Sequence, residues 1–177
     1  MYKSRERENI PRVYERSRKE KEKMKSKYNE YTLRRCTVQD VDQIYELQTI
    51  IINGLDNKEI LRQNAKDMFE HCVQEPNLTI GVYNKEELIA VSIFVVEHGV
   101  EDLSLDLVCH EVSVSANYKL IMVKKEYRGN GFQKALMWVM EKYAYNNGFT
   151  HLCTTVSEKN TYSLHNIEEI GYEYDHD

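Results

Sequence analysis

The most constraining feature of this chain is an apolar run that breaks into a glycine-containing turn and then opens a helix. The segment 122–136 reads MVKKEYRGNGFQKAL. Glycine adopts positive φ without steric cost, so Gly129 and Gly131 permit a sharp turn and a close backbone approach to a ligand. The first N–H groups of the helix lack acceptors and carry the positive end of its dipole. The sequence therefore predicts a junction that binds an anion such as a pyrophosphate.

The helix after this turn is expected to run from Gly131 to Asn146. Its apolar residues recur at the spacing of one buried helical face, which comprises Phe132, Ala135, Leu136, Val139, Met140, Tyr143 and Ala144. Two nucleotide-binding loops are excluded by spacing. The P-loop pattern G-x-x-x-x-G-K-[ST] is absent, and a dinucleotide fingerprint needs a small residue where Lys134 stands.

The turn resembles the acyl-CoA loop of the GNAT N-acetyltransferase superfamily, whose pattern is [Q/R]-x-x-G-x-[G/A]. Arg128 and Gly131 match this pattern, whereas Gln133 stands where the family has a small residue. A glutamine side chain there could itself donate to the pyrophosphate.

A later segment also resembles this family. Asn160, Ser163 and the pair Gly171-Tyr172 match its N-x-x-[AS]…G-[FY] motif, with the expected spacing of eleven from Asn160 to Gly171. The resemblance implies that Asn160 and the following helix border the pantetheine and diphosphate of the cofactor. The tyrosine that often protonates the departing thiolate would fall at Ile167, so the general acid must be another group or water.

The order of elements expected along the chain agrees with the resemblance, which covers roughly residues 31–174. Strands are expected at 31–36, 78–83, 88–97, 118–124 and 151–156, and helices at 41–53, 58–73, 131–146 and 161–170. The region 98–115 favours a loop with a short helical piece, although a strand extension also fits. The resemblance implies an α/β fold with a GNAT-like mixed, mostly antiparallel central sheet flanked by helices.

Both ends of the chain are expected to differ from an ordinary family member. Residues 1–30 are interpreted as a charged helical or partly disordered extension, and residues 31–177 as the acyltransferase domain. Family members usually continue past Gly171-Tyr172 into a final hairpin, whereas here there is room for one short strand. An unpaired sheet edge invites pairing, so either the N-terminal segment or a second subunit in a homodimer is expected to cover it.

Charge is distributed unevenly along the 177 residues. Residues 1–31 carry eleven lysines and arginines against six glutamates, a net charge of +5. Because the whole chain has a net charge of −5, residues 32–177 carry −10. An acidic domain disfavours nucleic acid and favours a cationic amine as partner.

The cysteine spacing and the lack of long apolar runs argue against a zinc protein and against a membrane or secreted protein. Cys36, Cys72, Cys109 and Cys153 lack the spacing of a zinc site, so they are expected to be reduced core residues and no metal is expected. No run of 18 uncharged apolar residues and no signal-peptide core occurs, which predicts a cytoplasmic protein without membrane contact.

The resemblance implies a set of cofactor contacts. The strand before the loop would meet the pantetheine amides and the thioester carbonyl through the backbone of Ile121, Met122 and Val123. The remaining expected contacts are Arg128, Gly129, Asn130, Gly131, Phe132, Gln133, Lys134, Asn160 and Ser163.

Catalysis requires removal of a proton from the attacking amine. Glu97, at the end of the expected second hairpin strand, is the first candidate base, although a solvated strand-end glutamate fits as well. His110 and Glu111 follow, and Tyr118 could orient the substrate. The function expected is transfer of an acetyl group from acetyl-CoA to a primary amine of a small molecule or protein, by direct attack in a ternary complex. The alternative is a catalytically degenerate acyl-CoA-binding or protein-interaction module.

Overall fold

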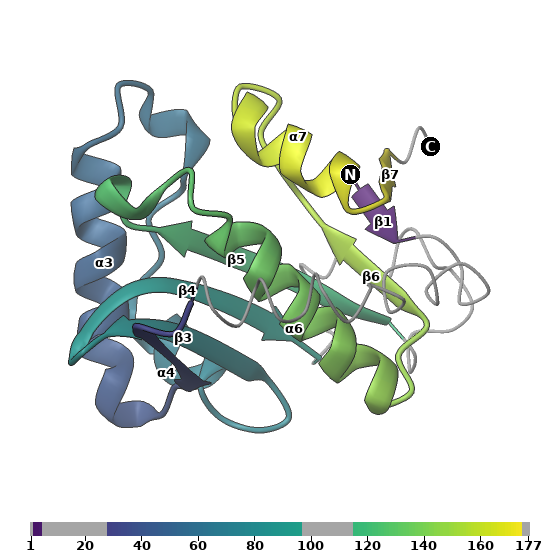
Figure 1. Ribbon diagram of the computed structural model, residues 1–177, viewed down its shortest axis with the longest axis horizontal. Coiled ribbons are helices and arrows are strands. Elements are labelled where there is room, and N and C mark those ends of the chain that lie inside the picture. Colours follow the sequence, from purple (N-terminus) through teal and green to yellow (C-terminus); the bar gives the residue numbers. More distant parts are fainter. Residues whose placement is uncertain (1, 5–27, 97–114, 175–177) are drawn as a thin grey trace.

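The computed structural model describes residues 2–4, 28–96 and 115–174, and in this part of the chain seven strands form one mixed sheet with the order β2-β3-β4-β5-β6-β1-β7 (Figure 1). The strands are β1 (Tyr2–Ser4), β2 (Tyr31–Arg35), β3 (Leu78–Asn84), β4 (Glu87–Val95), β5 (Ser115–Val123), β6 (His151–Thr154) and β7 (Tyr172–Tyr174). The α-helices are α3 (Val41–Asn53), α4 (Lys66–Cys72), α6 (Phe132–Asn146) and α7 (Thr161–Glu169). Short 3-10 helices occupy Val38–Asp40, Lys58–Ile60 and Lys125–Tyr127. The predicted α/β class and its mostly antiparallel sheet are confirmed.

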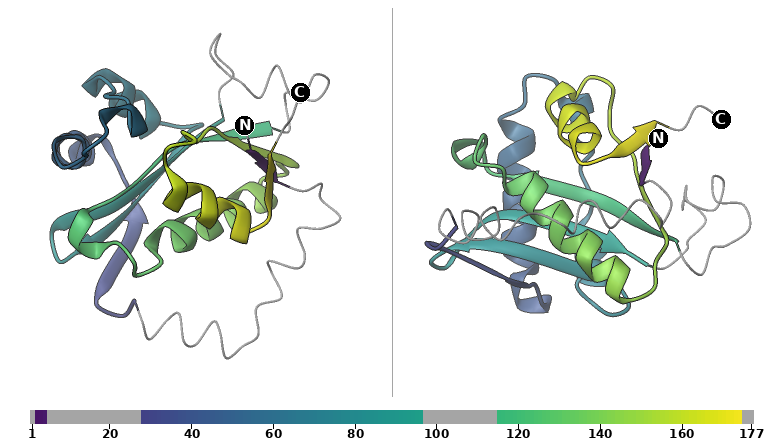
Figure 2. Two further views of the ribbon diagram at one scale, coloured as in Figure 1. Left: turned by 90° about the horizontal axis from the view of Figure 1, so that it is seen from above. Right: turned by 45° about the vertical axis from the view of Figure 1, so that its right-hand side comes forward.

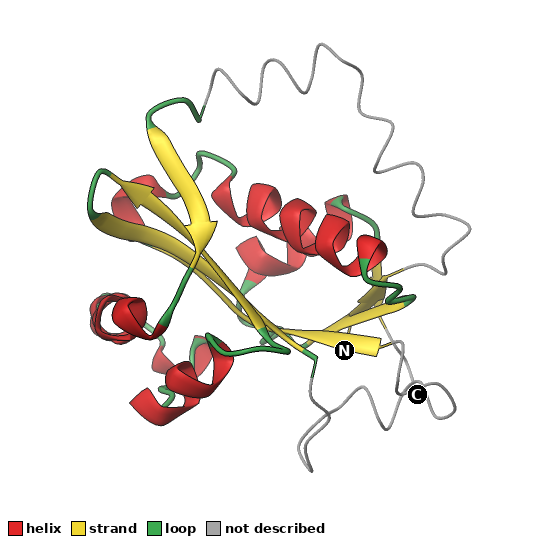
Figure 3. Ribbon diagram, turned by 90° about the horizontal axis from the view of Figure 1, so that it is seen from below, coloured by secondary structure: helices red, strands yellow, loops and turns green. Residues whose placement is uncertain are grey.

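The sheet separates two apolar cores, which explains why β3 and β4 are nearly continuous apolar runs. Helices α6 and α7 cover one face, and α3 and α4 cover the other (Figures 2 and 3). On the α6 side the core includes Phe94 and Leu136, both without solvent exposure. On the α3 side Ile44 and Phe69 are equally buried. The central hairpin β3–β4 is therefore fixed from both faces.

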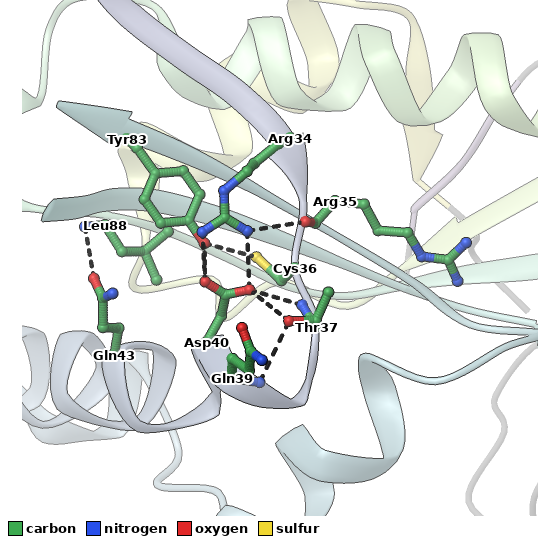
Figure 4. A network of polar contacts seen from close by, with 9 residues as sticks. All are labelled: Arg34, Arg35, Cys36, Thr37, Gln39, Asp40, Gln43, Tyr83 and Leu88. Atoms are coloured by element: carbon green, nitrogen blue, oxygen red, sulfur yellow. Dashed lines mark hydrogen bonds and ion pairs between the residues drawn. The ribbon is translucent and has the colours of Figure 1, made fainter. Parts of the chain in front are cut away.

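An ion pair between the exposed Arg34 and the buried Asp40 joins the edge strand β2 to the start of α3 (Figure 4). Arg34 donates to both carboxylate oxygens of Asp40, at 2.9 Å to Oδ2 and 2.7 Å to Oδ1. Asp40 Oδ1 also accepts the Tyr83 hydroxyl at 2.9 Å, and the Arg34 guanidinium lies 4.0 Å from the centre of the Tyr83 ring. Thr37 and Asp40 also form a capping box. Strand β2, strand β3 and helix α3 are thereby locked at one point.

Burial and hydrogen bonding shift the pKa values of several groups in this network. The Arg34 guanidinium, with further donors at Thr37 and Tyr83, holds the pKa of the Asp40 carboxyl well below its usual range. Burial raises the pKa of the Cys36 thiol to about 11 and also raises that of the Tyr83 hydroxyl. Asp40 is therefore ionised and Cys36 is a protonated thiol at neutral pH. Cys36, Cys72 and Cys153 are all buried, as predicted, whereas Cys109 lies outside the described residues.

Strand β1 fills the place next to β7. It pairs antiparallel with β6 through Lys3 and Cys153, and antiparallel with β7 through Lys3 and Glu173. The N-terminal segment therefore covers the edge of β6, whereas no strand among the described residues pairs with the outer side of β7. Residues 2–4 thus belong to the sheet although they lie within the stretch interpreted as an extension. Tyr28 also packs on the domain, because its ring lies 5.2 Å from that of Phe132.

Two sequence expectations need correction, and a third is not tested. The helix expected at 58–73 is a 3-10 turn at Lys58–Ile60 followed by α4, because Gln48 binds the backbone of Asn64 and holds the intervening chain out of the helix. Helix α6 buries Met137 completely, whereas Val139 and Tyr143 are only partly buried, so its inner face is rotated from the expected one. The expected segment 98–115 lies outside the described residues, except for Ser115 at the start of β5.

We predict that Asp40→Asn lowers the free energy of unfolding at pH 7 by about 2 kcal/mol, since the buried carboxylate loses charge-assisted hydrogen bonds from Arg34, Thr37 and Tyr83. The folded-state pKa of Asp40 is depressed, so its stabilisation is present above the unfolded value near 4 and is lost as the pH falls. The difference between variant and wild type should therefore shrink by about 1 kcal/mol at pH 3. Denaturant titrations at both pH values measure it.

The matched control is Asp42→Asn, which breaks an ion pair with Lys66 in which the Asp42 side chain is 83% exposed. Asp42→Asn should leave the free energy of unfolding nearly unchanged, because exposed ion pairs contribute little. Equal losses for Asp40→Asn and Asp42→Asn would contradict a special role for the contacts of Asp40.

We also predict that Lys3→Pro destabilises the domain, because β1 lies between two strands and proline removes a ladder hydrogen bond. The midpoint of thermal unfolding should fall by about 6 °C or more, whereas Lys3→Ala should leave it nearly unchanged. An unchanged midpoint for Lys3→Pro would show that β1 contributes nothing to the sheet.

Candidate functional site

Strand β5 loses its partner on one side halfway along its length. It pairs with β4 from Asn117 to Val123, whereas its parallel pairing with β6 stops at Tyr118. The register against β4 shifts at the same place, because Lys119 is an extra residue without a counterpart in β4. Such a β-bulge bends a strand and increases its twist. Among the described residues no strand therefore pairs with β5 on its β6 side beyond Tyr118 (Figure 1).

The backbone groups that face this open side follow from the ladder. Lys124 N–H donates to the Ile89 carbonyl at 2.9 Å, so Lys124 points toward β4. Alternation along a strand then directs the backbone of Met122 toward β4 and that of Ile121 and Val123 toward the open side. The Met122 side chain is buried in the core on the α3 face. Of the three expected backbone contacts, Ile121 and Val123 have the orientation that a ligand on the open side requires.

The glycine loop follows β5 directly and has the conformation that the sequence predicts. Gly129 and Gly131 have φ of 76° and 82°, and Gly131 is the residue that precedes α6. The first helical bond runs from Ala135 N–H to the Gly131 carbonyl at 3.0 Å, and no side chain caps the helix start. The N–H groups of the first turn of α6 therefore have no helical acceptor. Arg128 is exposed beside them, with Nε donating to the Val123 carbonyl at 3.2 Å.

An aromatic cluster holds this loop in place. Phe132, which the resemblance places at the cofactor, is only 3% exposed, and its ring centre lies 5.0 Å from that of Tyr31. The Tyr28 hydroxyl donates to the Asn130 carbonyl at 2.8 Å. The Asn130 side chain donates to the Tyr127 carbonyl at 3.1 Å, which uses its amide nitrogen within the loop. Sequence reasoning missed Tyr28, because a lone tyrosine at the end of a charged segment carries no signal of its own.

Two residues of the first turn of α6 contact α7 instead of facing solvent. Gln133 Nε2 donates to Ser163 Oγ at 2.9 Å, and Gln133 Oε1 accepts from Asn166 Nδ2 at 2.7 Å. The Lys134 ammonium pairs with Glu169. The residue that departs from the family pattern thus bonds to protein groups, and its partner Asn166 was absent from the sequence-based set.

The start of α7 carries the other expected site residues. Asn160 caps this helix by accepting Ser163 N–H at 3.2 Å. Ile167 is 2% exposed and lies in the core on the α6 side of the sheet. A side chain at this position could therefore reach the surface only if the core repacked. Tyr162, by contrast, is 86% exposed on the first turn. Its phenol is an exposed group with an acidic proton close to Asn160 in the sequence.

Tyr118, expected to orient substrate, lies in the core. It is 3% exposed and its hydroxyl donates to the Met137 carbonyl at 2.9 Å, which ties β5 to α6. Its ring packs edge-on against Tyr172, whose pKa is raised by complete burial. Tyr118 therefore supports the point where β5 and β6 diverge. The candidate bases Glu97, His110 and Glu111 lie outside the described residues.

Two further tests concern metals and membranes. Within residues 28–96 and 115–174 no group of three or more His, Cys, Asp or Glu side chains is arranged to hold a metal ion. Among the helices that the structure describes, none is both long and apolar enough to span a bilayer.

Comparison with known proteins agrees with this geometry. Residues 41–172 match the model of the acetyltransferase (GNAT) family. A comparison with curated proteins gives no match. The fold is similar to that of the PaiA N-acetyltransferase from Thermoplasma acidophilum in complex with coenzyme A, with a TM-score of 0.65, 14% identity and coverage of 82% of this chain and 91% of that one.

Two other solved structures share the fold. The ribosomal-protein-S18-alanine N-acetyltransferase from Escherichia coli has a TM-score of 0.63 at 14% identity, over 82% of this chain and 79% of that one. An aminoglycoside acetyltransferase from an uncultured soil metagenomic sample, in complex with trehalose, has a TM-score of 0.59 at 10% identity, over 80% of this chain and 88% of that one. Identities this low show the fold alone, but the family match covers most of the chain. The chain belongs to the GNAT acetyltransferase family.

Proposed function

We propose that this protein is an N-acetyltransferase that moves an acetyl group from acetyl-CoA to a primary amine of a small molecule or protein. One observation carries the proposal. The open side of β5 leads directly into a glycine loop whose helix presents uncapped N–H groups. An extended chain of amides that ends in a diphosphate complements both parts of this surface.

The diphosphate would bind at the first turn of α6. The helix dipole and the unpaired N–H groups favour an anion there, and Arg128 adds a full positive charge beside the loop. Lys134 is less free to contribute, because its ammonium already pairs with Glu169. The preformed aromatic support of the loop lowers the entropy cost of binding.

The pantetheine arm would lie along the open side of β5. Its two amides can pair with the backbone of Ile121 and Val123 as an added strand pairs with a sheet edge. A backbone N–H on this side would also donate to the thioester carbonyl oxygen as it gains negative charge. Main-chain groups suffice for this role, which explains why the side chains here need only be apolar.

The reaction proposed is direct attack by the amine nitrogen on the thioester carbonyl carbon. A C–N bond forms, the C–S bond breaks, the amine loses a proton and the CoA thiolate leaves. Glu97 remains our candidate for accepting the proton. The acceptor is proposed to be cationic, because residues 28–96, which include α3 and α4, carry eleven carboxylates against six lysines and arginines.

The test is release of CoA thiol from acetyl-CoA in the presence of a panel of amines and amine-bearing peptides. Turnover with any acceptor supports the enzyme. Tight CoA binding without turnover across the whole panel would favour the degenerate binding module, a reading that the buried Ile167 in the usual place of the acid keeps open.

We predict that Gly131→Val weakens CoA binding at least about tenfold, because a β-branched residue resists a φ of 82° and would displace the N–H groups of the turn. Gly148→Val is a matched control. Gly148 has a φ of 83° and lies beyond the other end of α6, so the strain is the same but the diphosphate site is distant. Calorimetric titration of both variants with CoA decides the matter, and unchanged affinity in a folded Gly131→Val protein would sink the assignment.

We predict that Tyr162→Phe changes turnover by less than about threefold. A thiol with a pKa of roughly 8 to 9 leaves as thiolate without help from a strong acid, so an acid adds little. Steady-state kinetics with the best acceptor provide the measurement. A loss larger than tenfold in kcat with unchanged CoA affinity would instead identify Tyr162 as the proton donor.

A further inference from the structure

The side chain of Gln133 is enclosed by polar groups of α7. Its oxygen accepts the Asn166 amide at 2.7 Å, and its nitrogen donates to Ser163 Oγ at 2.9 Å. All three side chains are partly buried. Because Gln133 lies in the first turn of α6 and Ser163 in the first turn of α7, this contact brings the starts of the two helices together.

This arrangement has an electrostatic consequence. Each helix start carries positive charge from its dipole and from N–H groups without helical acceptors. On α7 the Asn160 side chain takes Ser163 N–H, which leaves the N–H groups of Thr161 and Tyr162 for other acceptors. The two positive helix ends repel each other. An anion between them, or hydrogen bonds between the two helices, offsets this repulsion, and Gln133 supplies such hydrogen bonds.

We infer that Gln133 is a positioning residue, which holds the first turn of α7 against the first turn of α6 so that both act on the same diphosphate. This inference rests on the proposed function. A small side chain at position 133 would leave the spacing of the two helices to packing alone. The second link, between Lys134 and Glu169, is half exposed and an ion pair of this kind contributes little. The partly buried amide contacts of Gln133 therefore set the spacing.

The alternative is that Gln133 itself donates to the diphosphate. The two readings differ in what they expect of Asn166, which the positioning model couples to the site only through Gln133. The experiment compares Gln133→Ala, Asn166→Ala and the double variant. Asn146→Ala is the control, an exposed amide at the far end of α6. Affinity for CoA is measured by calorimetry, affinity for pantetheine by ligand-observed NMR titration, and stability by thermal unfolding.

We expect Asn166→Ala, which removes one hydrogen bond, to weaken CoA binding about fivefold, the effect of about 1 kcal/mol. Gln133→Ala removes two hydrogen bonds and should weaken CoA binding further. The double variant should bind CoA as weakly as Gln133→Ala alone, because Asn166 acts only through the Gln133 side chain. Pantetheine lacks the diphosphate, so its affinity should not change, and neither should that of the control for CoA.

Three results would overturn the inference while leaving the proposed function intact. The first is weaker CoA binding in Gln133→Ala with normal binding in Asn166→Ala, which would make Gln133 a direct ligand. The second is a lower unfolding temperature in both variants with unchanged CoA affinity. The third is an equal loss of affinity for pantetheine. Absence of CoA binding by the wild-type protein would overturn the proposed function itself, and this inference with it.

Discussion

The divergence of β5 from β6 is the constraint on which the candidate site depends. Parallel strands that stay paired would satisfy every backbone group of β5 and leave nothing for a ligand. Here pairing to β6 ends at Tyr118, and the extra residue Lys119 bends β5 at the same position. The hydroxyl of Tyr118 holds this point against α6, and Thr154 Oγ1 donates to the Tyr118 carbonyl at 3.2 Å. The backbone of β5 beyond Tyr118 is thus left unpaired on this side because of the contacts that hold Tyr118 in place.

Sequence reasoning could predict the elements whose causes are local. The positive φ of Gly129 and Gly131, the capping box at Thr37 and Asp40, and the apolar face of α3 all follow from spacing within a few residues. The open edge of β5 was expected only from the family resemblance. A bulge at Lys119 leaves no mark in the order of polar and apolar residues.

What the sequence could not predict depends on partners far away in the chain. The helix expected at 58–73 is interrupted because Gln48, one turn from the end of α3, binds the Asn64 backbone. The role of Gln133 required knowing that Asn166 lies beside it, 33 residues later. Strand β1 is only three residues long and charged at its centre, so neither periodicity nor hydropathy indicates a strand within the sheet.

Strand β1 connects the periphery of the fold to the site. It pairs with β6 at Cys153 and Thr154, and Thr154 is also the last residue that β6 pairs with β5. A short strand held on one side only would be free to twist further around β5 and narrow the open edge. With β1 on its other side, β6 is part of a ladder that continues to β7, which restrains its direction. The angle at which β6 leaves β5, and so the width of the open side where we propose that the acyl-CoA arm lies, therefore depends on the backbone pairing of residues 2–4.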